Sequence, residues 1–246
     1  MLSSLGRRAF HRAEEDLMNH VHPTAVIGDD VHLGSGNVIG AFTVILGPAQ
    51  IGDGNWIGPH VVIGTPAEIR GIDHGLVDGG VGTGISIGDA NVIREYTTVH
   101  QGHYARTIIN NGCYLMNRCY IAHDDVLDDG VTMASGVALG GHVKVGSGAN
   151  LGMGAIVHQR RMVGPLAMVG MSAVVTRDVP PAALAYGNPC RVRGANRVGM
   201  QRAGVGVDAI AAVELAYSAG QVHRFDDDLV LARAWNWWTA ENAPTP

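Results

Sequence analysis

The sequence has few cysteines and aromatic residues, no long apolar run and no large excess of charge, and each shortage excludes a class of protein. Its three cysteines, Cys113, Cys119 and Cys190, form neither a disulfide framework nor a CxxC metal motif. A net charge of −5 gives no bulk attraction to nucleic acid. No stretch approaches the roughly 18 apolar residues of a membrane span, and the N-terminus lacks a signal-peptide core. We therefore expect a cytoplasmic protein with no nucleic-acid partner and no membrane span.

Glycine is abundant, with 35 residues, and an aliphatic residue recurs at every sixth position over most of residues 27–175. This period fits neither an α-helix nor an ordinary strand. Six residues make one side of a coil, and three sides close a triangular coil whose inward aliphatic residues stack about 4.8 Å apart. The pattern predicts an all-β solenoid, a parallel β-helix, although the period does not reveal its hand. The markers are Ile27, Leu33, Ile39, Ile45, Ile51, Ile57 and Ile63, then Ile87, Ile93 and Val99, then Ile109, Leu115, Ile121, Leu127, Met133, Leu139, Val145, Leu151, Val157, Val163, Val169 and Val175.

The repeat divides the chain into segments and is interrupted at residues 66–84 and 100–108. Excursions from a solenoid gather on one face and often shape binding sites. We expect three segments: an N-terminal helical extension over 1–21, the β-helix over 22–190 and a small helical C-terminal region over 191–246. Within them, helices are predicted over 4–18, 207–219 and 226–240.

Counting coil sides in threes places four histidines along one edge of successive coils: His100, His123, His142 and His158. Any one of them alone is more often structural than catalytic, because parallel solenoids stack like residues. Four on one edge, flanked by Asp124, Gln159 and the glycines at 140–141, favour proton-transfer chemistry near neutral pH.

Zinc is the main metal alternative, since three imidazoles can hold this ion with one position open. Carbonic anhydrases of the γ class use the same kind of solenoid, with a ligand pair five residues apart. None of the 12 histidines here are separated by five positions, so we expect no metal. A non-catalytic scaffold is a further alternative, which the clustered histidines make less attractive.

Several short motifs go beyond the repeat, and together they resemble one family. They are HPTAVIG (22–28), IREYTTVHQG (93–102), IAHDD (121–125), GGHVKVG (140–146), AIVHQ (155–159), DVPP (178–181) and GNP (187–189). Over residues 22 to about 204 the chain resembles the UDP-N-acetylglucosamine O-acyltransferase of lipid A biosynthesis, a hexapeptide-repeat acyltransferase. The resemblance implies a left-handed β-helix, a homotrimer, no bound cofactor and an acyl carrier protein thioester or acyl-CoA as co-substrate.

The resemblance also implies site roles, and the chemistry agrees with them. A sugar hydroxyl is a poor nucleophile, so a base must take its proton while a donor stabilises the oxyanion formed from the thioester. By resemblance His123 is that base, Asp124 orients it and the backbone N–H of Gly141 is the oxyanion donor. The positions that match substrate contacts are Arg70, His100, His142, His158, Gln159, Asn196 and Arg202.

The sequence departs from the family at the acyl-chain and sugar positions. Tyr120 stands where the family often has a second histidine, three residues before the base. Met171 stands where the family has a glycine that leaves a long acyl groove open, so we expect a shorter acyl chain. Methionine is otherwise a common core residue, so only its match to the family's glycine position suggests a role in acyl-chain length.

Other departures lie near the nucleotide and the thioester. Val198 and Ala203 replace a glutamate and an arginine beside the nucleotide, and Arg160 and Arg161 add positive charge after the HisGln pair. The two arginines are equally consistent with a solvated surface and with contact to an acidic carrier protein. The sequence thus predicts an acyltransferase acting on a nucleotide-linked sugar. An acetyl-CoA-dependent N-acetyltransferase of a nucleotide-linked amino sugar is the alternative.

Overall fold

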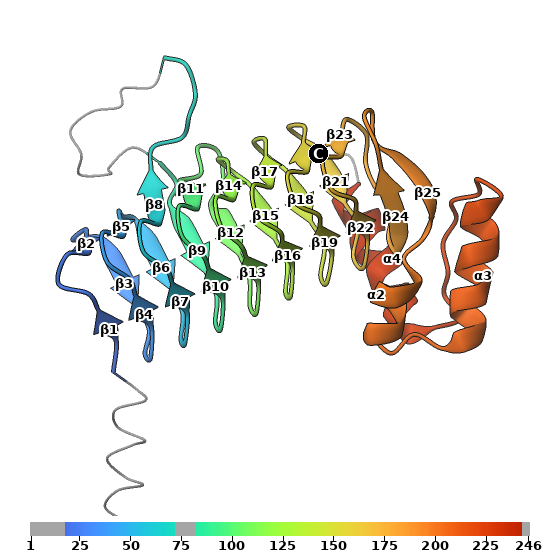
Figure 1. Cartoon of the computed structure of the whole chain (residues 1–246), viewed down its shortest axis with the longest axis horizontal. Helices are drawn as coiled ribbons and strands as arrows, with labels where there is room; N and C mark the ends of the chain where they lie inside the picture. The colour runs from blue at the N-terminus through green and yellow to red at the C-terminus, as the bar shows by residue number, and fades with distance from the viewer. Residues whose placement is uncertain (1–17, 72–81, 243–246) are drawn as a thin grey trace, which may run out of the picture.

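The structure, a computed structural model, describes residues 18–71 and 82–242. Its main body is a three-sided solenoid in which, as far as Val175, strands three places apart in the chain pair in parallel. Figure 1 shows the coils stacked in chain order, with the helices gathered at the C-terminal end. The predicted parallel β-helix is therefore confirmed.

The strands form three sheets, one for each side of the coil. The first sheet contains β1 (His20–Val21), β4 (Val38–Ile39), β7 (Trp56–Ile57), β10 (Val92–Ile93), β13 (Tyr114–Leu115), β16 (Thr132–Met133), β19 (Asn150–Leu151), β22 (Met168–Val169), β24 (Ala183–Tyr186) and β25 (Arg191–Ala195). The second contains β2 (Val26–Ile27), β5 (Val44–Ile45), β8 (Val62–Thr65), β11 (Thr98–His100), β14 (Tyr120–Ile121), β17 (Ala138–Leu139), β20 (Ile156–Val157) and β23 (Val174–Val175). The third contains β3 (Val31–Leu33), β6 (Ala49–Ile51), β9 (Ile85–Ile87), β12 (Thr107–Ile109), β15 (Val126–Leu127), β18 (Lys144–Val145) and β21 (Met162–Val163).

The aliphatic markers fill the interior of the coils. Every marker from Ile39 to Val175 is at most 3% exposed. Burying each such side chain stabilises the fold by about 1.5–3 kcal/mol. Ile27 and Leu33 are only half-buried, because they belong to the first coil of the described chain, which is covered on one side only.

A column of asparagines occupies one corner of the N-terminal coils, which we call the asparagine column: the exposed Asn19 at its end and the buried Asn37, Asn55 and Asn91. The Oδ1 of Asn37 accepts the backbone N–H and the side-chain amide of Asn55, at 2.9 and 3.0 Å. Asn55 does the same for Asn91, at 2.9 and 3.0 Å. Each side chain therefore satisfies the polar groups of the next coil, as buried polar groups require.

The solenoid ends in a hairpin and three helices. β24 and β25 pair antiparallel. They are followed by α2 (Arg197–Arg202), α3 (Val207–Ser218) and α4 (Leu229–Glu241). The two predicted C-terminal helices are confirmed as α3 and α4, whereas α2 was not predicted. α4 starts after Asp228, whose carboxylate accepts the N–H groups of the first turn. The helix predicted over 4–18 lies outside the described residues except for its last position. Within the described ranges, no helix is long and apolar enough to cross a membrane.

Candidate active site

Both interruptions of the repeat fall at one corner, where the chain passes from the second sheet to the third. Paired strands are normally 18 residues apart, but Trp56 and Val92 are 36 apart and Val92 and Tyr114 are 22 apart. The extra residues follow β8 and β11, and a bridge between Gly84 and Gly102 joins the two excursions. We call this edge of the solenoid the histidine corner, because His123 and His142 follow the next two strands of the same sheet, β14 and β17.

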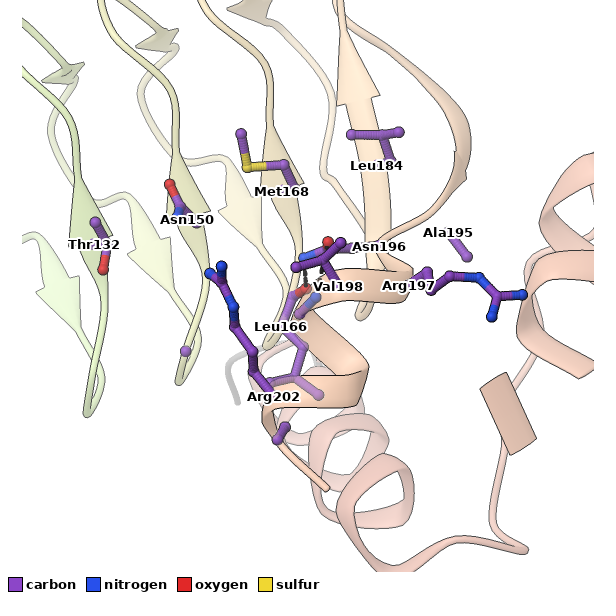
Figure 2. Close-up of a pocket in the computed structure, with 13 residues that line it drawn as sticks. Thr132, Asn150, Leu166, Met168, Leu184, Ala195, Asn196, Arg197, Val198 and Arg202 are labelled. Atoms are coloured by element: carbon purple, nitrogen blue, oxygen red, sulfur yellow. Dashed lines mark hydrogen bonds between the residues drawn. The ribbon is translucent and has the colours of Figure 1, made fainter. Parts of the chain in front are cut away.

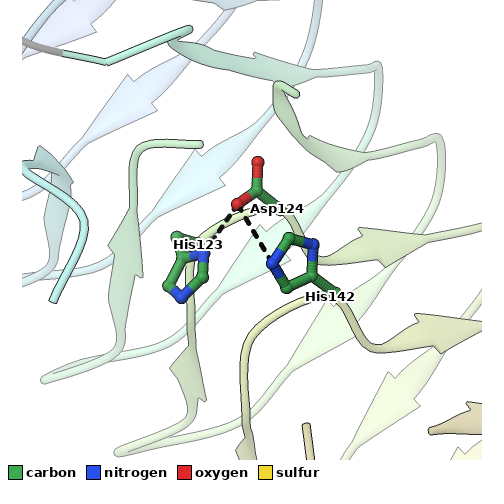
Figure 3. A group of neighbouring side chains, drawn as sticks. All are labelled: His123, Asp124 and His142. Atoms are coloured by element: carbon green, nitrogen blue, oxygen red, sulfur yellow. Dashed lines mark hydrogen bonds and ion pairs between the residues drawn. The ribbon is translucent and has the colours of Figure 1, made fainter. Parts of the chain in front are cut away.

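His123, Asp124 and His142 meet at the histidine corner. Figure 3 shows the carboxylate of Asp124 between the two imidazoles. His123 Nδ1 lies 2.6 Å from Asp124 Oδ2, and His142 Nε2 lies 3.7 Å from the same oxygen. The two rings are 5.1 Å apart and nearly perpendicular. Asp124 and His142 both have φ of 62°, a left-handed conformation that turns the chain tightly and brings neighbouring coils together here.

The loop after β11 fixes Asp124. Its Oδ1 accepts the backbone N–H groups of His103, Tyr104 and Ala105, at 3.1, 2.8 and 2.6 Å. The side chain is 1% exposed. Burial acts to raise the pKa of Asp124, but the hydrogen bonds from His123 and the N–H groups of Ala105 and Tyr104 outweigh it and lower this pKa. Asp124 is therefore ionised near neutral pH and holds the His123 ring with the proton on Nδ1.

The other ring nitrogen of His123 faces Gly141. A Cβ on Gly141 would lie 2.6 Å from His123 Nε2 and 2.7 Å from Cε1, so only glycine leaves this ring in place. Gly141 also lines an open groove of about 360 Å³, together with Tyr120, Gly140, Ile156, His158 and Gln159. A reacting group in this groove would lie beside Gly141, the residue that His123 Nε2 faces.

His142 is held as a neutral imidazole. Burial lowers its pKa, and the nearby positive charge of Arg160 acts in the same direction, whereas Asp124 opposes them. Arg160 is exposed. Arg161 pairs with Asp178 at 3.4 Å.

The remaining histidines of the predicted ladder follow the same sheet but do not join this cluster. His100 Nδ1 contacts Thr65 Oγ1 at 3.1 Å and the Pro66 carbonyl at 3.0 Å, and it lies 3.4 Å from a carboxylate oxygen of Glu68. His158 is exposed, and its Nδ1 lies 3.1 Å from the carbonyl of Gln159. Arg70 is exposed on the loop after β8.

Asn196 and Arg202 lie elsewhere in the chain. They line a pocket of about 760 Å³ on the outer face of the first sheet, with Val198 and Ala203. Figure 2 shows Arg202 extending from α2 towards β19. Asn196 begins α2, and its amide group donates to the Leu166 carbonyl at 2.8 Å. One chain therefore does not bring these two residues together with the histidine corner.

Met171 also lies outside the histidine corner. It follows β22 on the first sheet and is 72% exposed. It stacks one coil beyond Met153, which is 56% exposed.

His123, Asp124 and His142 also carry atoms that could bind a metal ion. Among residues 18–71 and 82–242, the potential ligand atoms of His123, Asp124 and His142 lie within 4.8 Å of one another. However, Asp124 Oδ1 already accepts three N–H groups and Oδ2 contacts His123 Nδ1. A metal ion would have to displace this hydrogen bond, so the arrangement fits a hydrogen-bonded acid–base pair better than a cation site.

The sequence did not predict two buried residues that hydrogen-bond the backbone next to His123 and Asp124. Thr107 Oγ1 accepts the N–H of Asp124 at 3.0 Å, and Asp125 is completely buried beside it. Both stand two positions before an aliphatic marker, as Asn37 and Asn91 do. A polar residue two positions before an aliphatic marker is therefore the sequence pattern that could have identified Thr107 and Asp125.

The solenoid of six-residue repeats, with a buried carboxylate orienting a histidine at one corner, defines the chain as a hexapeptide-repeat acyltransferase. Residues 178–224 match the family profile described as UDP N-acetylglucosamine O-acyltransferase, domain 2. The acyl-[acyl-carrier-protein]–UDP-N-acetylglucosamine O-acyltransferase of Saccharophagus degradans is 38% identical over 200 residues, which cover 80% of this chain and 75% of that protein.

Solved structures agree with this similarity. LpxA from Acinetobacter baumannii matches with a TM-score of 0.68 and 28% identity, over 92% of this chain and 90% of that one. UDP-N-acetylglucosamine O-acyltransferase from Moraxella catarrhalis matches with a TM-score of 0.66 and 27% identity, over 90% and 92%. The chain belongs to the UDP-N-acetylglucosamine O-acyltransferase family, and its β-helix is left-handed like theirs.

Proposed function

We propose that this enzyme transfers an acyl group from an acyl carrier protein thioester to a hydroxyl of a UDP-linked sugar, with His123 as the general base. One observation carries the proposal: His123 is held through Nδ1 by the buried, ionised Asp124, at 2.6 Å, while Nε2 faces Gly141, which lines the open groove. The carrier and the sugar nucleotide are those named for the relative from Saccharophagus degradans.

The proposed reaction balances within this site. His123 Nε2 takes the proton of the sugar hydroxyl as the oxygen attacks the thioester carbonyl carbon. The carbonyl oxygen becomes an oxyanion and accepts the N–H of Gly141. When the C–S bond breaks, the thiolate leaves and receives the proton from Nε2, which regenerates neutral His123. Asp124 keeps the other proton on Nδ1 and stabilises the imidazolium between the two steps.

The separation of the residues supports a site shared between subunits. Asn196 and Arg202 line the pocket on the first sheet, whereas the base lies between the second and third sheets. In the homotrimer that the resemblance implies, one subunit contributes the histidine corner and its neighbour contributes the pocket residues and Met171. The exposed Met171 then limits the acyl chain to a shorter length than the family's long hydroxyacyl groups.

Thiol release from a series of acyl carrier protein thioesters, with UDP-N-acetylglucosamine as acceptor, tests the proposal. His123→Ala is expected to reduce kcat by about 10²–10⁴-fold, the usual contribution of a general base. His32→Ala, at an exposed position in β3, is the matched control and should keep the wild-type rate. Full activity in His123→Ala would overturn the mechanism. Turnover only with acetyl-CoA and an amino-sugar nucleotide would replace the proposed reaction with N-acetylation.

A further inference from the structure

Asp125 lies next to the His123–Asp124 pair but points into the solenoid. Its side chain is completely buried. Oδ2 accepts the N–H of Ala122 at 2.9 Å, and Oδ1 accepts the N–H of Val143 at 2.7 Å. Both carboxylate oxygens are therefore occupied by backbone groups, one from its own coil and one from the next.

These two backbone groups adjoin the imidazoles of the site. Ala122 directly precedes His123, and Val143 directly follows His142. One carboxylate thus joins the two chain segments that present the catalytic base and its neighbour. Asp124 joins the same two residues from the outside, through its contacts with both rings.

The solenoid does not need a carboxylate at this position. The equivalent positions one coil before and one coil after Asp125 are occupied by Thr107 and Val143, which are also completely buried. Burial raises the pKa of Asp125 well above its usual range, because removing a carboxylate from water disfavours its charged form. Among the described coils, a carboxylate occupies this inward position only on the coil that carries His123.

We propose that Asp125 is a positioning residue for acyl transfer: by bonding the N–H groups of Ala122 and Val143, it sets the distance between His123 and the backbone of Gly141 and His142. This inference rests on the proposed function of His123. Asp125 touches neither substrate, so its loss should misplace the base while leaving substrate binding nearly unchanged.

Three substitutions at this position grade the effect. Asp125→Asn keeps one acceptor oxygen but turns an NH₂ group towards a backbone N–H. Asp125→Thr keeps one acceptor, a hydroxyl oxygen like that of Thr97, which accepts the N–H of Cys119. Asp125→Val keeps no acceptor. We expect kcat to fall by about 10-fold in the Thr variant and about 100-fold in the Asn and Val variants, because a misplacement of about 1 Å can cost 100-fold. KM for both substrates should change by less than about threefold.

Asn91→Val is the matched control. Asn91 is also completely buried at a corner and accepts the N–H of Cys113 at 2.7 Å. The same corner position is occupied by Val131 one coil after Cys113, so a valine fits there. Asn91→Val and Asp125→Val should lower the unfolding temperature by similar amounts, but only the second should lower kcat.

The outcomes are distinct. Wild-type kcat in folded Asp125→Val or Asp125→Thr, with His123→Ala inactive, would overturn the positioning role and leave the proposed function standing. Equal losses of kcat in Asn91→Val and Asp125→Val would also overturn it. If His123→Ala is fully active, the proposed function fails instead. Should Asp125→Val not fold, the Thr variant, which keeps one hydrogen bond, decides the question.

Discussion

Two polar corners of the same solenoid have opposite characters. In the asparagine column, the side-chain oxygens of Asn37 and Asn55 each accept two donors of the next asparagine, and Asn37, Asn55 and Asn91 are at most 1% exposed. At the histidine corner, Asp124 is equally buried, but the side chains of His123 and His142 remain 14% and 21% exposed. The first corner directs its side-chain hydrogen bonds to neighbouring coils. The second keeps two imidazole rings partly exposed.

The difference arises from which residues stack. One residue type repeated on successive coils completes its own hydrogen bonds and stabilises the stack. A carboxylate placed between two imidazoles instead orients two rings that remain partly exposed. The same 18-residue register thus produces a structural column in one place and a candidate site in another.

The largest effect should come from Asp124→Asn, which would make the histidine corner resemble the asparagine column. An amide cannot hold the proton on His123 Nδ1 as a carboxylate does, so we expect kcat to fall by about 10²–10⁴-fold. Steady-state kinetics measure this loss, and Asn37→Asp, a reciprocal change in the other column, should lower stability with little effect on kcat. A kcat of Asp124→Asn within threefold of wild type would contradict the role of the carboxylate.

The same variant changes the acid stability. Because the folded-state pKa of Asp124 is lowered, its contribution to stability is present above the unfolded value near 4 and is lost as pH falls through the folded value. Wild type should therefore lose more unfolding free energy than Asp124→Asn as the pH is lowered from 5 to 2. Denaturant titrations at several pH values test this, and parallel curves for the two proteins would contradict it.

Gly141→Ala should have the next largest effect. The new Cβ would overlap the His123 ring, and because that ring can swing away, we expect kcat to fall about 100-fold with only a small change in unfolding temperature. Gly28→Ala is the control, because its Cβ would meet neighbouring atoms at an ordinary 3.5 Å. Unchanged kcat in Gly141→Ala would show that His123 need not face this glycine.

Met171→Gly is expected to change selectivity more than rate. Removing the exposed side chain should raise kcat/KM for longer acyl chains by about tenfold relative to shorter ones, since each added methylene in an apolar pocket is worth about 1 kcal/mol. Met153→Gly, one coil earlier in the same column, should leave the preference unaltered. A series of carrier thioesters of increasing length measures the shift, and an unaltered preference in both variants would remove Met171 from the acyl site.

Tyr104→Ala should have the smallest effect. The ring is 72% exposed and lies 5.7 Å from that of His142, but the loop holds Asp124 through its backbone N–H groups. We therefore expect kcat within about twofold of wild type, because no hydrogen bond to the carboxylate is removed. A loss greater than tenfold would mean that the Tyr104 ring contributes directly to the reaction.

The sequence predicted the coils well, because an aliphatic residue at every sixth position fits the side of a three-sided coil and fits neither an α-helix nor an ordinary strand. It also placed His123 and His142 on a common corner, since that follows from counting sides. It did not separate His100 and His158 from the cluster, because their neighbours depend on side-chain direction and on loops outside the repeat.

The buried support of the site was harder to foresee. The three N–H groups that hold Asp124 come from a loop whose conformation no periodicity specifies, and their donors are backbone groups that any sequence carries. Asp125 appeared only as part of a motif, although its place before Leu127 matches the inward positions of the asparagine column. α2 was missed because six residues are too few to display a helical period.

Both insertions of the solenoid lie at the histidine corner, and the coils on either side of them keep their pairing. Since each coil bonds only to its neighbours, the chain can lengthen at this corner without altering the interior. The fold thereby separates two evolutionary tasks: the loops beside His123 can change in length and sequence, while the column of aliphatic residues continues to hold His123 in one place.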